Sequence, residues 1–172
     1  VCVVYAGAET YGDFEYSVRY DDTVVITDYN GSAEKVDIPA EIDGNSVTEI
    51  YDNAFSDCAS FTTITIPDSV TSIGYCAFKG CTSLTSIIIP DGVKSIEAST
   101  FESCESLTSV TIPDSVTKID RHAFYNCTSL KYVVIPASVT YVWEEAFGYN
   151  FNGYDDDNYA ISKKADDFKI SY

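Results

Sequence analysis

The sequence is poor in groups that could perform catalysis. Its 172 residues include a single histidine, His122, which stands beside Ala123 and Phe124 in an expected turn. A catalytic site needs a nucleophile, a base and an orienting group. The sequence also has no glycine-rich phosphate loop and no paired-cysteine metal spacing. We therefore expect a protein that is not an enzyme, binds no cofactor or metal, and exposes His122 in a turn.

Positive charge and long apolar runs are scarce as well. Ten lysine and arginine residues stand against 27 aspartate and glutamate residues, so the net charge is −17. This charge repels phosphate groups and argues against binding to nucleic acid or to an anionic membrane. No run of 18 apolar residues exists that could be inserted into a membrane. Hydrophobic residues still make up 45% of the chain, which excludes disorder and fits one folded domain.

The stretch from Leu84 to Cys104 is a unit that recurs every 23 residues. It reads Leu84-x-x-Ile87-x-Ile89-Pro90-x-x-Val93-x-x-Ile96, then Thr100-Phe101-x-x-Cys104. Three further series share the period: Phe55, Phe78, Phe101, Phe124 and Phe147; Pro67, Pro90, Pro113 and Pro136; and Cys58, Cys81, Cys104 and Cys127. Repeats of about 20–29 residues with a Leu-x-x-Ile-x-Ile core are typical of a leucine-rich-repeat solenoid.

Each repeat is predicted to form one turn of that solenoid, which we call a rung. Ile87 and Ile89 alternate with polar residues, which indicates a short strand with one buried face. Pro90 has no N–H and ends the strand, and Asp91 can form an Asx-turn with the backbone ahead. Val93 then points inward from the opposite wall. The Ala-Phe segment is expected to form a tight helical turn whose ring fills the core between rungs.

The predicted fold is a leucine-rich-repeat solenoid of short parallel strands, stacked at a 23-residue period, with β-rich caps at both ends. Residues 1–32 are assigned to an N-terminal segment with a cap hairpin, 33–150 to five rungs, and 151–172 to a C-terminal cap. The first rung is degenerate and carries an insertion.

Local patterns support these assignments. Alternating apolar residues around a polar turn predict a hairpin within 14–29. The insertion near 42–46 contains a Gly-Asn pair and should project as a loop. Residues 159–161 and 168–172 alternate as two short strands of the C-terminal cap.

Two segments allow alternative interpretations. Residues 1–8 resemble the end of a signal peptide with an Ala6-Gly7-Ala8 cleavage site, or they form an ordinary first strand. Asn150, Asn152 and Asp155 approximate a calcium loop only loosely, and a solvated polar loop is the simpler interpretation.

Four of the six cysteines occupy one position in successive rungs, where their side chains should stack about 5 Å apart with parallel Cβ vectors. Asn150 stands in the fifth place of this column, which favours buried, reduced side chains over disulfide bonds. The predicted structural ladder is Cys58, Cys81, Cys104, Cys127 and Asn150. Cys2 and Cys76 lie outside the column and could pair only if the fold brings them together.

The residues that flank the first buried isoleucine of each rung should point outward and form the binding surface. They are Thr63, Thr65, Ser86, Ile88, Ser109, Thr111, Tyr132 and Val134. The last pair is aromatic and aliphatic. With Tyr141 and Trp143 expected nearby, the C-terminal rungs should carry an exposed apolar patch unless the cap covers it.

The rungs closely resemble the BspA-like, or Treponema-pallidum-type, leucine-rich repeats. Residues 66–74, Ile-Pro-Asp-Ser-Val-Thr-Ser-Ile-Gly, match the family pattern Ile-Pro-x-Ser-Val-Thr-x-Ile-Gly, and the resemblance covers roughly residues 14–150. It implies a secreted or cell-surface protein of anaerobic bacteria or protozoan parasites that adheres to host proteins or other cells. The family motif contains no catalytic residues.

Two classes of function follow as expectations. The first is a monomeric, extracellular protein-binding or adhesion module whose ligand is a host matrix protein or another surface protein. The alternative is a passive spacer or scaffold in a larger surface protein. The acidic turns at Asp68, Asp91 and Asp114 form a second candidate surface, which would attract basic partners in a salt-sensitive way. An ice- or glycan-binding face is disfavoured because Ile88 and Tyr132 break the hydroxylated columns.

Overall fold

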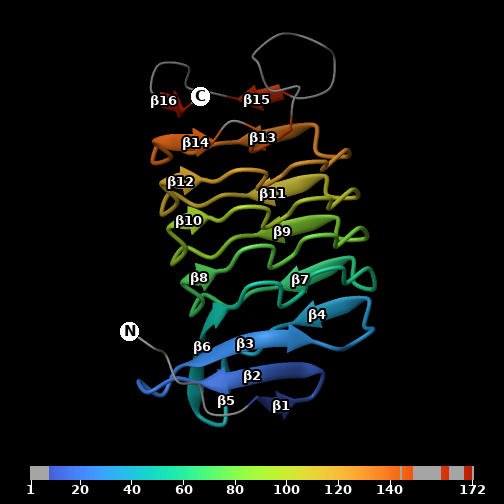
Figure 1. Cartoon of the computed structure of the whole chain (residues 1–172), viewed down its shortest axis with the longest axis vertical. Helices are drawn as coiled ribbons and strands as arrows, with labels where there is room; N and C mark the ends of the chain where they lie inside the picture. Colours follow the sequence, from blue (N-terminus) through green and yellow to red (C-terminus); the bar gives the residue numbers. More distant parts are fainter. Residues whose placement is uncertain (1–7, 144, 149–159, 163–168, 172) are drawn as a thin grey trace.

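The computed structural model describes residues 8–143, 145–148, 160–162 and 169–171. Over these ranges the chain winds as a β-solenoid whose turns stack along the long axis (Figure 1). The predicted solenoid is therefore confirmed. The helical turn predicted at the Ala-Phe segment is wrong, since the described residues contain no helix. In the rung of Phe78, Cys76 and Gly80 have positive φ angles of 55° and 73°. These angles lie outside the right-handed helical region, so the segment around Phe78 forms tight turns and no helix.

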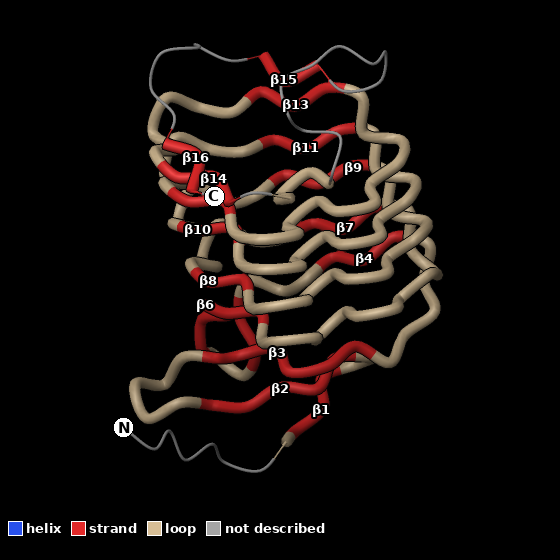
Figure 2. The backbone as a smooth tube through the Cα atoms, turned by 45° about the horizontal axis from the view of Figure 1, so that its top comes forward, coloured by secondary structure: helices blue, strands red, loops and turns tan. Residues whose placement is uncertain are grey.

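Parallel strands line two opposite walls of the solenoid (Figure 2), and a break in the pairing divides each wall into two sheets. The first strands of the rungs are β4 (Lys35–Asp37), β7 (Thr63–Thr65), β9 (Ser86–Ile88), β11 (Ser109–Thr111), β13 (Tyr132–Val134) and β15 (Ala160–Ser162). The second strands are β8 (Ser72–Ile73), β10 (Ser95–Ile96), β12 (Lys118–Ile119), β14 (Tyr141–Trp143) and β16 (Lys169–Ser171). β15 pairs with β13 and β16 with β14, so the two strands expected near the C-terminus add one strand to each wall.

An antiparallel layer closes the N-terminal end. β1 (Glu9–Tyr11), β2 (Phe14–Val18) and β3 (Val24–Tyr29) pair in this order, which confirms the predicted hairpin. β3 then runs parallel to β6 (Asn45–Ile50), the first strand of the second wall. Val24, Val25 and Ile26 are fully buried. The layer thus covers the apolar end of the first rung.

The insertion in the first rung does not project as a loop, contrary to the sequence-based prediction. β5 (Glu41–Ile42) pairs antiparallel with the start of β6, and Asp43 and Gly44 form the two-residue turn with φ angles of 52° and 83°. Such a turn suits a tight hairpin. The hairpin packs inward because its apolar residue, Ile42, is 1% exposed, and the Tyr16 hydroxyl donates to Asp43 Oδ2 at 2.8 Å.

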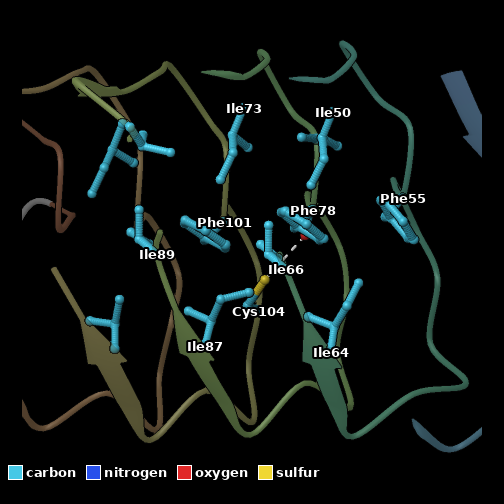
Figure 3. Packing of buried hydrophobic residues seen from close by; sticks show 14 of the residues in the cluster. Ile50, Phe55, Ile64, Ile66, Ile73, Phe78, Ile87, Ile89, Phe101 and Cys104 are labelled. Carbon is cyan, nitrogen blue, oxygen red and sulfur yellow. Dashed lines mark hydrogen bonds between the residues drawn. The ribbon is translucent and has the colours of Figure 1, made fainter. Parts of the chain in front are cut away.

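A column of stacked aromatic rings runs through the core between the walls. It contains Tyr29, Phe55, Phe78, Phe101, Phe124 and Phe147, with neighbouring centroids 5.1–5.5 Å apart. Figure 3 shows the rings of Phe55, Phe78 and Phe101 lying between the isoleucines of the two walls. Because each ring contacts the ring above and the ring below, every rung depends on its neighbours for burial.

The cysteine column lies next to the rings. Its thiols form hydrogen bonds to backbone carbonyl oxygens and are not joined to one another in disulfide bonds. Cys81, Cys104 and Cys127 donate to the carbonyl oxygens of Phe55, Phe78 and Phe101 at 3.1–3.2 Å. Figure 3 shows Cys104 and this bond to Phe78. A hydrogen bond with Cys104, followed by burial, raises the pKa of Cys81. Cys2 and Asn150 lie outside the described residues.

We predict that the buried column thiols resist alkylation in the native protein. Thiolate is the reactive form, and both burial and raised pKa values keep Cys81 and Cys127 protonated. Among the described cysteines, half-buried Cys76 should react first with iodoacetamide. Mass spectrometry before and after denaturation without reductant measures this. A Cys81–Cys104 disulfide, or equally fast labelling of Cys104 and Cys76 in the folded state, would contradict the prediction.

Two positions of the repeat have positive φ in successive rungs of the described residues. The first series is Asn53, Cys76, Ser99, His122 and Glu145, and the second is Asp57, Gly80, Ser103 and Asn126, with φ from 55° to 73°. Few non-glycine residues adopt this conformation, and asparagine and aspartate do so most readily. These angles are hard to predict from the sequence, because only one of the nine positions is glycine.

Candidate binding surface

The first wall presents one inward and two outward side chains from each strand. Ile64, Ile87, Val110 and Val133 point inward and are 2–9% exposed. The eight outward residues predicted as a binding surface flank them. Thr63 is half-buried and the other seven are exposed. The register places Thr63 beside Ser86 and Ser86 beside Ser109, so the outward residues form two columns along the axis.

Three outward residues on this face are large, apolar and exposed. Ile88 is 70% exposed, Tyr132 51% and Val134 54%. Ile88 and Val134 belong to the same column, two rungs apart, with Thr111 between them. The residues of the intervening rung, Ser109 and Thr111, are small. We refer to Ile88, Ser109, Thr111, Tyr132 and Val134 as the apolar face.

Tyr141 and Trp143 do not extend the apolar face, which corrects the expectation that they lie near it. Both belong to β14 of the second wall, which pairs with β12 and β16. Their rings contact each other edge to face at 5.6 Å. Sequence proximity to Val134 was misleading because the chain crosses from one wall to the other between β13 and β14.

One border of the first wall is a ladder of threonine hydroxyls. Thr85 and Thr108 each donate through Oγ1 to the carbonyl of the threonine one rung below, at 3.0 Å. Thr62 donates in the same way to the carbonyl of Glu34. These hydroxyls thus donate their hydrogen to backbone carbonyls of the solenoid itself. They hold neighbouring rungs together and leave the adjacent apolar face as the more available surface.

The opposite border is a row of exposed carboxylates, Asp68, Asp91 and Asp114, at one position of three successive turns. The predicted Asx-turns are not what closes these turns. The closing bonds join backbone atoms, from the N–H of Val70, Val93 and Val116 to the carbonyls of Pro67, Pro90 and Pro113 at 3.0–3.1 Å. The three carboxylates, which we call the acidic row, therefore remain exposed to solvent.

His122 is not the exposed turn residue that the sequence predicted. It is half-buried, its Nε2 lies 2.8 Å from Glu145 Oε2, and its ring is 4.9 Å from the Tyr125 ring. Arg121 Nη2 donates to the same oxygen at 3.1 Å. The correction has a backbone cause: φ is +58° at His122 and +62° at Glu145, which turns both side chains to the same corner of adjacent rungs.

This corner predicts a pH dependence of stability. The hydrogen bond from His122, and then that from Arg121, lowers the pKa of Glu145. A lowered pKa means that the interaction stabilises the fold above the ordinary glutamate pKa and is lost as pH falls through the lowered value. Glu145→Gln should therefore flatten the acid limb of the stability curve, measured by urea unfolding at several pH values. A control, Glu105→Gln, should leave that limb unchanged; an identical effect of both substitutions would refute the assignment.

The described residues contain no group of three or more His, Cys, Asp or Glu side chains arranged to hold a metal ion. Asn150, Asn152 and Asp155, the loosely matched calcium loop, lie outside the described ranges. Within those same described ranges, no helix is long and apolar enough to cross a membrane.

The sequence and structure resemble known leucine-rich-repeat proteins. A family model described as "BspA type Leucine rich repeat region" matches residues 29–152 in six copies. A leucine-rich-repeat protein of T. pallidum is 38% identical with a TM-score of 0.77, over 81% of this chain and 66% of that one. One from Bacteroides ovatus is 33% identical with a TM-score of 0.74, over 81% and 38% of the two chains.

A more distant structure is the pneumococcal vaccine antigen PcpA, which is 20% identical with a TM-score of 0.60 over 83% of this chain and 47% of that one. At this identity the likeness shows the fold alone. The chain thus spans about two thirds of the T. pallidum protein and less than half of the other two. A comparison with curated proteins returned no match.

Proposed function

Because this chain belongs to the BspA-type leucine-rich-repeat family, we propose that it is a non-enzymatic protein-binding module of a secreted or cell-surface protein. Its relatives are built from the same repeat, which supplies a long, regular surface rather than a catalytic pocket. The single histidine is engaged by Glu145 and Tyr125 in a corner between rungs. Family resemblance supports the surface location, and the ligand class is a host matrix protein or another surface protein.

The observation that carries the proposal is the exposure of Ile88, Tyr132 and Val134 on a wall whose other outward residues from β7 to β11 are serine and threonine. Full burial of an isoleucine or valine side chain is worth about 1.5–3 kcal/mol, and a binding partner could still gain part of that free energy at Ile88 and Val134, which are 70% and 54% exposed. Aromatic anchors that become buried contribute a large share of the binding energy of protein interfaces, and Tyr132 is the aromatic residue of this face. The placement of these three side chains on the outward side of one wall makes this face the best-supported binding site.

Tyr132→Ala tests the proposal, and Tyr75→Ala is its matched control. Both tyrosines are 51% exposed, but Tyr75 lies beyond β8, in the corner that follows the second wall. Binding to a panel of matrix proteins and bacterial surface extracts would be measured by surface plasmon resonance. We expect Tyr132→Ala to weaken the observed binding about tenfold or more at any ionic strength, whereas Tyr75→Ala leaves it unchanged.

Three other results would count against this site. Binding that ignores Tyr132→Ala but is abolished by high salt would move the site to the acidic row. Equal losses for both tyrosine variants would show non-specific adsorption. If no protein in the panel binds, the passive spacer or scaffold function is favoured instead.

A further inference from the structure

The apolar face has a repeat distance that selects the shape of its partner. Neighbouring hydrogen-bonded strands of a wall lie about 4.7–4.9 Å apart, and the ring centroids of the core column are 5.1–5.5 Å apart. An α-helix rises about 5.4 Å per turn, so a helix lying along the solenoid axis advances by roughly one rung per turn. An extended strand repeats its side chains on one face every ~6.6 Å and falls out of phase within two rungs.

The side chains of the apolar face fit the same spacing. Ile88 and Val134 are two rungs apart in one column, about 9.6 Å at the strand spacing, which is within about 1 Å of the ~10.5 Å rise of seven helical residues. Between them the small side chains of Ser109 and Thr111 leave room for a helix to approach the sheet. Apolar residues of a helix at positions i and i+7 would thus contact Ile88 and Val134, with a small residue over Thr111.

The charge of the acidic row indicates what a second stripe of that helix, next to its apolar stripe, should carry. Asp68, Asp91 and Asp114 repeat once per rung along the border of the wall and are exposed. Basic residues one turn apart, at i, i+4 and i+7 of a neighbouring stripe, have the same repeat. Attraction between the two rows would orient the helix, and the net charge of −17 would speed its arrival.

We propose that the apolar face and the acidic row together form a docking site for a basic amphipathic α-helix of a partner protein, lying along the solenoid axis. The inference rests on the proposed function and specifies its partner. The partner is a helix with an apolar i, i+7 stripe and an adjacent row of lysine or arginine residues.

The test uses two chemically stapled peptides of about 14 residues, long enough for two rungs on either side of the centre. The first carries leucines at i and i+7 to face Ile88 and Val134, and three lysines spaced one turn apart in the adjacent stripe, which starts one turn nearer the N-terminal rungs because Asp68 lies one rung before Ile88. The second has the same composition, staple and charge, with the lysines moved to the opposite face. Fluorescence anisotropy at low ionic strength gives the affinity of each for the full chain. We expect the first peptide to bind about tenfold or more tightly than the second.

Two charge-matched triple variants locate the contact. Asp68→Asn, Asp91→Asn and Asp114→Asn together should weaken binding of the first peptide about tenfold or more. Asp22→Asn, Asp28→Asn and Glu41→Gln remove the same charge from exposed positions at the N-terminal end and should cost less than about threefold. Ile88→Ser should weaken binding at both low and high salt.

Equal affinity of the two peptides, or equal effects of the two triple variants, would overturn the inference, since either shows non-specific attraction to an acidic protein. The tyrosine variants separate this failure from that of the proposed function. If Tyr132→Ala still abolishes capture of a protein ligand, the face binds proteins of another shape. If Tyr132→Ala is also without effect, both proposals fail.

Discussion

Replacing Phe101 with alanine is expected to destabilise the solenoid by about 3–5 kcal/mol. The ring is fully buried and stacks on Phe78 at 5.5 Å and on Phe124 at 5.3 Å, with interplanar angles of 4° and 11°. Its removal leaves a cavity that two rungs line, and neither can close it without leaving its own hydrogen-bonded register. Equilibrium urea unfolding, followed by circular dichroism, measures the loss.

Ser86→Ala provides the control on the same part of the solenoid. Ser86 is exposed on β9, and its substitution should change stability by less than about 0.5 kcal/mol. If Phe101→Ala and Ser86→Ala cost the same, then the core described between the two walls is wrong.

Removal of the N-terminal layer, residues 8–32, is expected to abolish cooperative folding altogether. Val24, Val25, Ile26 and Tyr29 are 0–6% exposed, and the Tyr29 ring stacks on Phe55 at 5.3 Å. At about 2 kcal/mol for each buried side chain, their loss approaches the total stability of an ordinary domain, about 5–15 kcal/mol. It also exposes the apolar end of the first rung, so the shortened chain should aggregate.

Thermal melts and hydrogen exchange of the full and shortened chains would measure this effect. Tyr20→Ser serves as the control, because Tyr20 is 80% exposed at the hairpin and its replacement should leave the melt unchanged. A shortened chain that still melts in one sharp transition near the original temperature would show that the repeats need no cover at this end.

The period of the sequence predicts most of the fold because a 23-residue repeat forces equivalent residues into columns. Once Ile87 is inward on β9, Ser86 and Ile88 must be outward, since successive side chains of a strand alternate. The same argument applies to every rung, which is why the exposed positions of the first wall could be named. The aromatic column follows from the spacing of the phenylalanines.

Backbone conformation and cross-wall contacts could not be predicted in this way. The left-handed angle at His122 leaves no mark in a sequence where serine, cysteine and glutamate occupy the equivalent positions. Without knowledge of this angle, the contact between His122 and Glu145 cannot be predicted, because the two residues lie on different rungs. The inward packing of the inserted hairpin could not be predicted for a related reason. Its turn residues are polar, and the burial of Ile42 depends on how the hairpin packs against β2 and β3.

The thiol column has a consequence for how such a chain could change in length. A disulfide framework needs cysteines in pairs, so adding one repeat would leave one sulfur unmatched. Here each thiol is satisfied by the carbonyl of the preceding rung, and a duplicated repeat brings its own donor and its own acceptor. Odd and even numbers of rungs are then chemically equivalent. Unequal recombination between repeats could lengthen or shorten the solenoid one turn at a time, without rebuilding the core or requiring an oxidant.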